Sequence, residues 1–208
     1  MSGSITLENR FGVNKMELIS LKYAIFVIVL LVLYYCFPKK YRWYVLLAGS
    51  MAYYVIICKW YLLFIIFTIC TTYGSTIWID KLLKKQNAIV KSHKEDWDRQ
   101  TRKDYKEKGR KKRVAVMLFA LLCNFGILAF LKYIPYAGEL GLLLPLGISF
   151  YTFQSMGYVM DVYREIVEPE KNFLKVALFV SFFPQIIQGP IAIYDKLAGQ
   201  LYEGHSLR

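Results

Sequence analysis

The stretch LPLGISFYTFQSMGYVMDVYR, Leu144 to Arg164, decides the fold. No charge occurs from Leu140 to Met160, and about 20 mostly apolar helical residues cross a bilayer core about 30 Å thick. Lipid cannot satisfy amides or carboxylates, so a polar face here should turn toward other helices or a water-filled cavity. On a helix, five polar residues fall within an arc of about 120°, called the seam below: Tyr151, Gln154, Ser155, Tyr158 and Asp161.

Further apolar blocks of similar length surround this one, in a chain of 208 residues that is 56% hydrophobic. The last block is interrupted by Pro184, Gly189 and Pro190. This composition excludes an ordinary soluble domain and predicts an all-α polytopic integral membrane protein with about six transmembrane segments, the last one broken. The expected spans are residues 18–37, 43–58, 60–79, 114–131, 140–160 and 176–194.

The positive charge is concentrated between two of these spans. Residues 80–113 contain 14 Lys/Arg and 6 Asp/Glu, most of the net charge of +12. Such a basic loop stays in the cytoplasm, which places residues 1–17 on the outside of the membrane. These residues are expected to be a disordered extension, and Met16 is an alternative start of the chain. Trp97 and Tyr105 among the lysines are typical of a nucleic-acid site. We favour a different role for the basic residues, which is to orient the chain in the membrane and to attract anionic membrane lipid, so no nucleic acid is expected. We expect a solvated helix on the membrane surface here.

The broken segment SFFPQIIQGPI strengthens the case for an internal cavity. Pro184 cannot donate to the carbonyl of Val180, so kinked or unwound backbone is predicted at membrane depth. Irregular backbone survives there only where protein or enclosed water shields it. The alternative for the seam is hydrogen bonding between helices, at about 1 kcal/mol per contact.

The chain offers few groups for acyl-transfer chemistry. A proton-transfer group, most often His, is needed near neutral pH, and only His93 and His205 are present. Both are interpreted as surface residues. No metal-ligand spacing, phosphate-binding loop or dinucleotide motif occurs, so no metal site is expected.

Several of these stretches resemble a known family. LPLGISFYTFQSMGYVMDVYR, NFLKVALFVSFFPQIIQGPI and YDKLAGQL together are similar to the membrane-bound O-acyltransferase (MBOAT) family, in its alginate O-acetylation branch. FPKKYRWYVLLAGSMAYY and NFGILAFLKY resemble earlier segments of that branch, so the similarity runs from about Leu18 to Tyr202. The D-alanyl-transferring relatives share FFP and GPI but differ at QIIQ and FYTFQ.

The resemblance implies a larger helix ring around a thinned centre. The acyl donor, acetyl-CoA or an acyl carrier, reaches that centre from the cytoplasm as a substrate, and a polysaccharide hydroxyl reaches it from outside. The family's catalytic His has no match here and is expected beyond Arg208, so no catalytic residue is assigned and this N-terminal fragment alone is expected to be inactive. Residues 195–208 are expected to form an interfacial helix before the truncation. The acyl passage would be lined or braced by Tyr151, Gln154, Tyr158, Gln185 and Gln188.

The expected function is transfer of an acyl group, in particular acetyl, to hydroxyls of a cell-surface or exported polysaccharide in a bacterial plasma membrane. Expected partners are membrane lipid, the missing C-terminal half, a polysaccharide acceptor and an extracytoplasmic acetyltransferase. The alternatives are D-alanyl transfer to teichoic acid, a membrane transporter and a non-catalytic scaffold.

Overall fold

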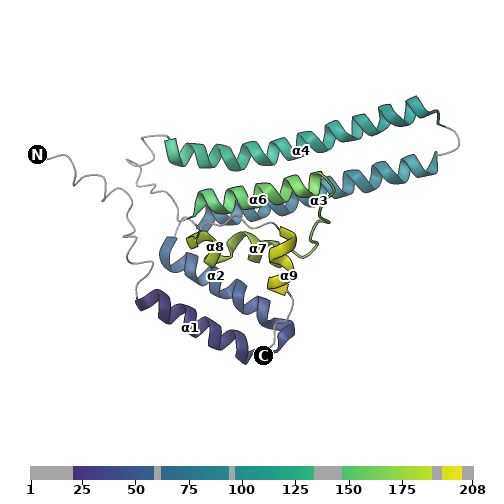
Figure 1. The fold of residues 1–208 in the computed structure, drawn as a ribbon. Helices are drawn as coiled ribbons and strands as arrows, with labels where there is room; N and C mark the ends of the chain where they lie inside the picture. The colour runs from purple at the N-terminus through teal and green to yellow at the C-terminus, as the bar shows by residue number, and fades with distance from the viewer. Residues whose placement is uncertain (1–20, 59–61, 94–96, 134–146, 189–193, 203–208) are drawn as a thin grey trace, which may run out of the picture.

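The computed structural model describes residues 21–58, 62–93, 97–133, 147–188 and 194–202, and this part of the chain is helical without a β-strand (Figure 1). The all-α prediction is confirmed for these residues. The expectations for residues 1–17 and for the end of the chain after Tyr202 lie outside them. The elements in order are α1 (Leu21–Cys36), the 3-10 turn η2 (Lys39–Tyr41), α2 (Arg42–Cys58), α3 (Leu62–Ser92), α4 (Arg99–Tyr133), α6 (Ile148–Tyr163), α7 (Phe173–Ser181), α8 (Phe183–Gln188) and α9 (Tyr194–Tyr202).

Two of these helices, α3 and α4, are long and apolar enough to cross a membrane by length and composition. The other apolar helices are shorter, so the number of about six spans stays a prediction. Helices α1 and α4 also expose large apolar side chains, among them Ile28, Val32, Phe119 and Leu122. Exposed apolar surface of this extent is typical of a lipid-facing or partner-facing helix, and it is consistent with a membrane protein.

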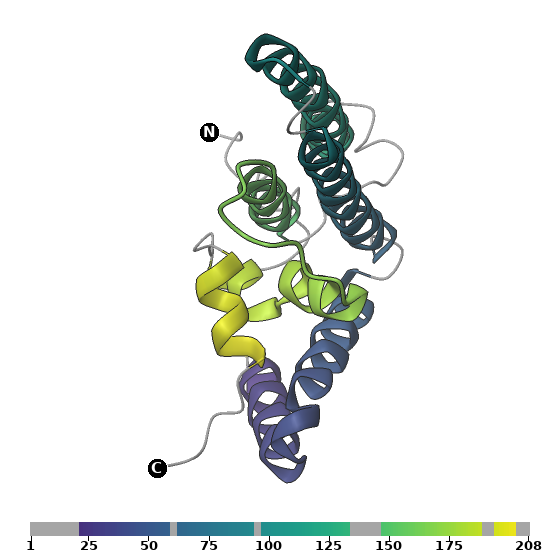
Figure 2. The same cartoon turned by 90° about the vertical axis from the view of Figure 1, so that its right-hand side faces the viewer.

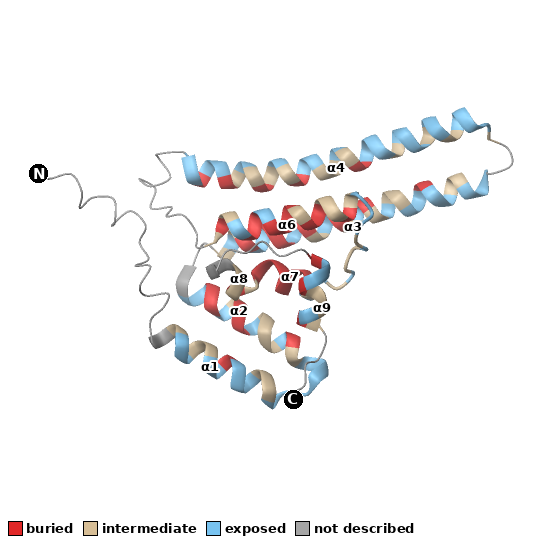
Figure 3. Ribbon diagram, in the orientation of Figure 1, coloured by how far each residue is buried: buried red, intermediate tan, exposed pale blue. Residues whose placement is uncertain are grey.

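The core lies around α6 and α7. Six consecutive residues of α7, Val176 to Ser181, are buried, as expected of a helix that is apolar on all sides. Helix α3 packs against α4, α6 and α7, while α2 packs against α7 and α1. Figure 2 shows α4 and α1 at opposite ends of this arrangement, and Figure 3 shows burial concentrated in α6 and α7.

The basic segment 80–113 departs from the expected surface helix. Helix α3 continues through it to Ser92, and α4 begins at Arg99, so the two form a hairpin that projects well past α6 (Figure 1). Ion pairs one turn apart, such as Lys84 with Asp80 at 2.5 Å, support these helices in water. The turn joining α1 to α2, with Lys39 and Lys40, lies at the same end of the molecule as the hairpin.

An ion pair joins the base of this hairpin to the end of α6. Helix α6 ends in a Schellman motif, in which the Glu165 N–H donates to the Val162 carbonyl (3.1 Å) and the Ile166 N–H to the Asp161 carbonyl (3.0 Å). Glu165 takes the left-handed conformation (φ 63°) that usually selects glycine. Its carboxylate lies 2.7 Å from the buried guanidinium of Arg113, and this contact requires a side chain at that position.

Candidate functional site: the junction of α6, α7 and α9

The seam of α6 turns into the protein, as the sequence predicts. Tyr151, Gln154, Ser155 and Tyr158 are each at most 3% exposed, and Asp161 is half-buried. Burial extends beyond the seam to residues that the periodicity places outside the polar arc, such as Val159, because α3, α4 and α7 all pack on α6. The exposed strip of the helix is narrow and aromatic, with Phe150 and Phe153.

The predicted break is present before Pro184. Helix α7 ends at Ser181, Phe182 is extended (φ −61°, ψ 101°), and α8 starts at Phe183. The last carbonyls of α7 therefore lack partners within their own helix. The amide of Gln154 donates to one of them, the Phe179 carbonyl, at 2.9 Å. Pro190 lies outside the described residues.

The other predicted passage residues occupy different surroundings. Ser155 donates within its own helix to the Tyr151 carbonyl. Gln185 on α8 is half-buried, and its Oε1 is enclosed without a hydrogen-bond partner among the described residues. The hydroxyl of Ser181, on the other side of the break, is also buried without one. Gln188 ends α8, but its side chain lies outside the described residues. The role of these residues in a passage stays a prediction.

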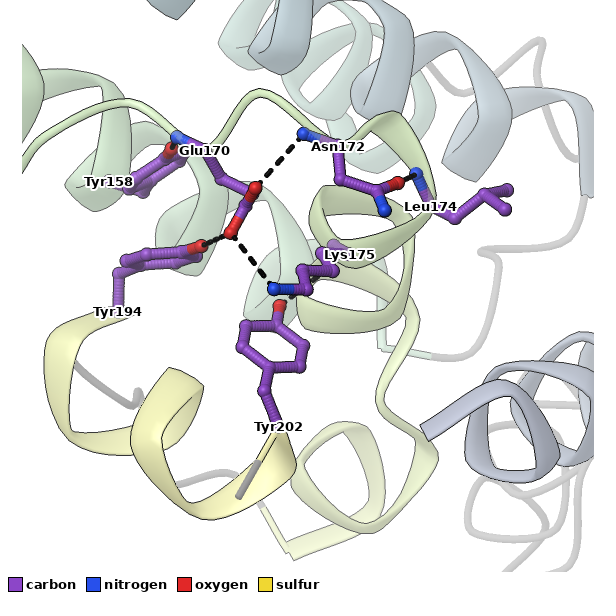
Figure 4. Close-up of polar contacts among 7 residues, drawn as sticks. All are labelled: Tyr158, Glu170, Asn172, Leu174, Lys175, Tyr194 and Tyr202. Carbon is purple, nitrogen blue, oxygen red and sulfur yellow. Dashed lines mark hydrogen bonds and ion pairs between the residues drawn. The ribbon is translucent and has the colours of Figure 1, made fainter. Parts of the chain in front are cut away.

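Beside the seam, a carboxylate joins three separate segments of the chain (Figure 4). The Glu170 N–H donates to the hydroxyl of Tyr158 at 2.8 Å. Its Oε1 accepts from the Asn172 N–H at 3.0 Å, while Oε2 lies 3.5 Å from the Tyr194 hydroxyl and 3.7 Å from Lys175 Nζ. Both carboxylate oxygens are thus engaged, so Glu170 is a positioned group that holds α6, α7 and α9 together.

Aromatic rings form the layer beneath this carboxylate. The rings of Tyr158 and Tyr194 stack with centroids 4.2 Å apart, and Phe179 meets both edge to face. Tyr202 donates to the Lys175 carbonyl at 2.8 Å, and Lys175 Nζ lies 4.7 Å from its ring centroid. Burial raises the pKa of the Tyr202 hydroxyl above its ordinary value, so it stays a donor.

A pocket of about 530 Å³ opens between α9 and residues 168–171. Three acidic residues line it, Glu168, Glu170 and Asp195, against one cation, Lys171. Its net charge is therefore negative, which disfavours an anionic ligand.

The described residues hold no group of three or more metal-ligating side chains. His93, on the exposed end of α3, has Nδ1 at 3.0 Å from Ser92 Oγ and 3.1 Å from the Ile89 carbonyl. Its ring stacks on Trp97, and it does not line the pocket between α9 and residues 168–171. His205 lies outside the described part of the chain. The junction is thus suited to positioning helices, with no nucleophile and base paired in it.

Sequence reasoning missed the Glu170 network. One signal was present: Asn172 precedes the apolar run of α7 and acts as its N-cap, accepting from the Leu174 N–H at 3.0 Å. The rest depends on how the turn after α6 and the start of α9 meet. Periodicity within one segment cannot reveal such a meeting.

The fold and site define a helical protein of membrane character, with a polar helix seam against a broken helix. No protein-family model and no solved structure matches the chain. Similarity to curated proteins nevertheless confirms the resemblance to alginate O-acetylases.

The relatives include proteins described as probable alginate O-acetylase AlgI. The one from Pseudomonas aeruginosa is 46% identical over 59 residues, 28% of this chain and 11% of the relative. The one from Azotobacter vinelandii is 36% identical over 91 residues, 43% of this chain and 17% of the relative. A peptidoglycan O-acetyltransferase from Helicobacter pylori is 32% identical, over 40% of this chain and 23% of the relative. The chain thus matches only a small part of each relative's length.

Proposed function

We propose that this chain is part of a multi-pass membrane O-acyltransferase, which transfers an acyl group, in particular acetyl, to hydroxyls of a cell-surface or exported polysaccharide. The single observation that carries the proposal is the local similarity to O-acetyltransferases. These relatives act, by their names, on two different polymers, alginate and peptidoglycan. The shared element is O-acetyl transfer to a polysaccharide, so the acceptor of this protein is left open.

The geometry supports a positioning role for this chain within such an enzyme. The seam of α6 is buried against a helix that breaks at Phe182, and polar groups of Ser181 and Gln185 are enclosed on either side of the break. Broken helices with enclosed polar groups are found where a substrate enters a membrane protein. In this proposal Tyr151, Gln154, Tyr158, Gln185 and Gln188 line or brace the acyl passage.

Acyl transfer needs a group that removes the proton from the acceptor hydroxyl as the new ester bond forms. His93 is exposed on the hairpin and donates or accepts locally, so it does not fit this role. We assign the catalytic base to a segment outside the described residues. The donor, acetyl-CoA or an acyl carrier, approaches from the cytoplasmic side, which in the proposed orientation is the end with the basic hairpin.

The experiment is deletion of the gene that encodes this chain in its source bacterium. O-acetyl groups on exported and cell-wall polysaccharides are then released by mild alkali and quantified, with D-alanine measured in the same extracts. The proposal expects O-acetyl ester to fall in the deletion strain and to be restored by the complete gene, while D-alanyl ester stays constant in both strains. Unchanged O-acetyl ester would overturn it, and a selective loss of D-alanine would favour teichoic acid as the acceptor.

A further inference from the structure

The two arms of the basic hairpin approach closely at Gln86 and Gly109. A side-chain carbon at position 109 would collide with the amide of Gln86, so glycine permits this crossing in the interior of α4, where it otherwise costs about 1 kcal/mol. The Gln86 amide then donates to the Lys106 carbonyl at 3.2 Å. Two grooves run along the paired arms, and Gln86 lines both of them.

The two grooves differ in charge. One, of about 600 Å³, contains Glu107 and Glu165 among its basic residues. The other, of about 530 Å³, contains no acidic residue and is called the lysine groove below. Its charged residues are Lys85, Lys108, Lys111 and Lys112.

Within the part of the chain that the structure describes, three of these four lysines have no counter-ion. Lys111 pairs with Glu107 at 3.2 Å, whereas Lys85, Lys108 and Lys112 have no ion pair among the described residues. Lys108 and Lys112 lie one helical turn apart, so their ammonium groups extend from the same face of α4. Helix α3 contributes Lys85 from the opposite wall, and Tyr105 of α4 also lines the groove.

The lysine groove also lies at a distance from the apolar parts of its helices where phosphate groups are found at a membrane. Lys85 is six residues past Ile79, and Lys108 is six residues before Val114, so both lie about 9 Å beyond the apolar parts of their helices. The headgroup layer of a bilayer is roughly 5 to 8 Å thick on each side, so the groove is at its outer edge. Both lipid headgroups and soluble phosphates reach this level.

We propose that the lysine groove binds a phosphate group, carried by an anionic lipid or by a soluble polyphosphate compound. Several ammonium groups around one anion give charge-assisted hydrogen bonds, and multiple phosphates use all four lysines. The acidic pocket beside Glu170 does the opposite and repels such a ligand. This inference does not depend on the acyl-transfer function.

The test uses the full chain in two arms. In the first, binding of inorganic pyrophosphate is measured by calorimetry on protein in phosphatidylcholine nanodiscs. In the second, retention of phosphatidylglycerol from mixed micelles with phosphatidylcholine is counted by native mass spectrometry. The test variant is K108Q/K112Q, and the matched control is K81Q/K91Q, which removes the same charge from exposed hairpin positions outside the groove. Circular dichroism checks that both variants keep their helices.

The proposal expects K108Q/K112Q to weaken binding by about tenfold in at least one arm, while the control changes it less than about twofold. A selective loss in the pyrophosphate arm identifies a soluble phosphate as the ligand. A selective loss in the phosphatidylglycerol arm identifies a lipid headgroup. Equal losses in the two variants, or no loss in either arm, would mean that only diffuse charge acts, and the proposal would be wrong.

Discussion

The side chain of Gln154 on α6 donates to the main-chain carbonyl of Phe179 on α7, at 2.9 Å and out of contact with solvent. Phe179 lies in the last turn of a helix that stops before Pro184, so its carbonyl has no partner in its own helix. Gln154 of the seam thus supplies the hydrogen bond that the Phe179 carbonyl lacks because its helix ends. The polar seam and the broken helix are parts of one structural arrangement.

Replacing Gln154 with methionine should destabilise the protein by about 1 to 3 kcal/mol. Methionine has a similar length but no donor, so the Phe179 carbonyl would be buried without a partner. Unfolding in detergent, followed by circular dichroism, measures the loss. The control is Phe153→Leu, on the exposed strip of the same helix, where less than about 1 kcal/mol is expected. A smaller loss for Gln154→Met than for the control would contradict the capping role.

Glu165→Gly should destabilise the protein less than Glu165→Ala does. Either substitution leaves the buried Arg113 guanidinium without its carboxylate. Only alanine keeps a Cβ in the left-handed conformation, which costs about 1 kcal/mol relative to glycine. We therefore expect Glu165→Gly to be the more stable variant by about that amount in denaturant unfolding. Equal stabilities would show that the backbone at this position is not strained.

The helices were predictable where membrane physics alone determines them. Apolar blocks without charge locate the cores of α3, α4 and α6, and the missing N–H of Pro184 locates the break. The burial of the seam follows because lipid offers no partner to Gln154. These inferences need only the bilayer and the chain's own hydrogen-bonding groups.

Two features were not predictable in this way. A hydropathy argument stops a span at the first charges, yet α3 continues past Asp80 because a helix persists in water where i, i+4 ion pairs support it. The Glu170 network needs Tyr158, Glu170 and Tyr194, from three segments, to meet. That meeting depends on the Schellman turn at Glu165 and the position of α9, and neither has a strong local signature.

Neutralising Glu170 should weaken the junction of the three helices. Glu170→Gln removes the ion pair with Lys175 and the charge on the acceptor of the Tyr194 hydroxyl. Because the pair is only partly buried, the expected loss is about 1 kcal/mol in denaturant unfolding. The matched control is Glu168→Gln, which changes an exposed residue of the same pocket and should have almost no effect. Equal losses in the two variants would argue against the network.

The stability of the junction should fall at alkaline pH because the Tyr202 hydroxyl loses its proton more easily in the unfolded chain. Burial raises the pKa of this hydroxyl in the folded state above the ordinary value of about 10, so the unfolded chain loses its proton first. The stabilisation is therefore complete below about pH 10 and is lost progressively as pH rises above it. Tyr202→Phe removes the titrating group, so its unfolding free energy should decline less steeply between about pH 9 and 11.

Tyr202→Phe should also lower the free energy of unfolding at neutral pH. Phenylalanine keeps the ring beneath Lys175 but loses the hydrogen bond to the Lys175 carbonyl, which is worth about 1 kcal/mol. Tyr202→Phe should thus be less stable than the parent at pH 7, with the difference narrowing as pH rises. Parallel declines of the two proteins would show that the Tyr202 hydroxyl is not held in its neutral form by burial against α7.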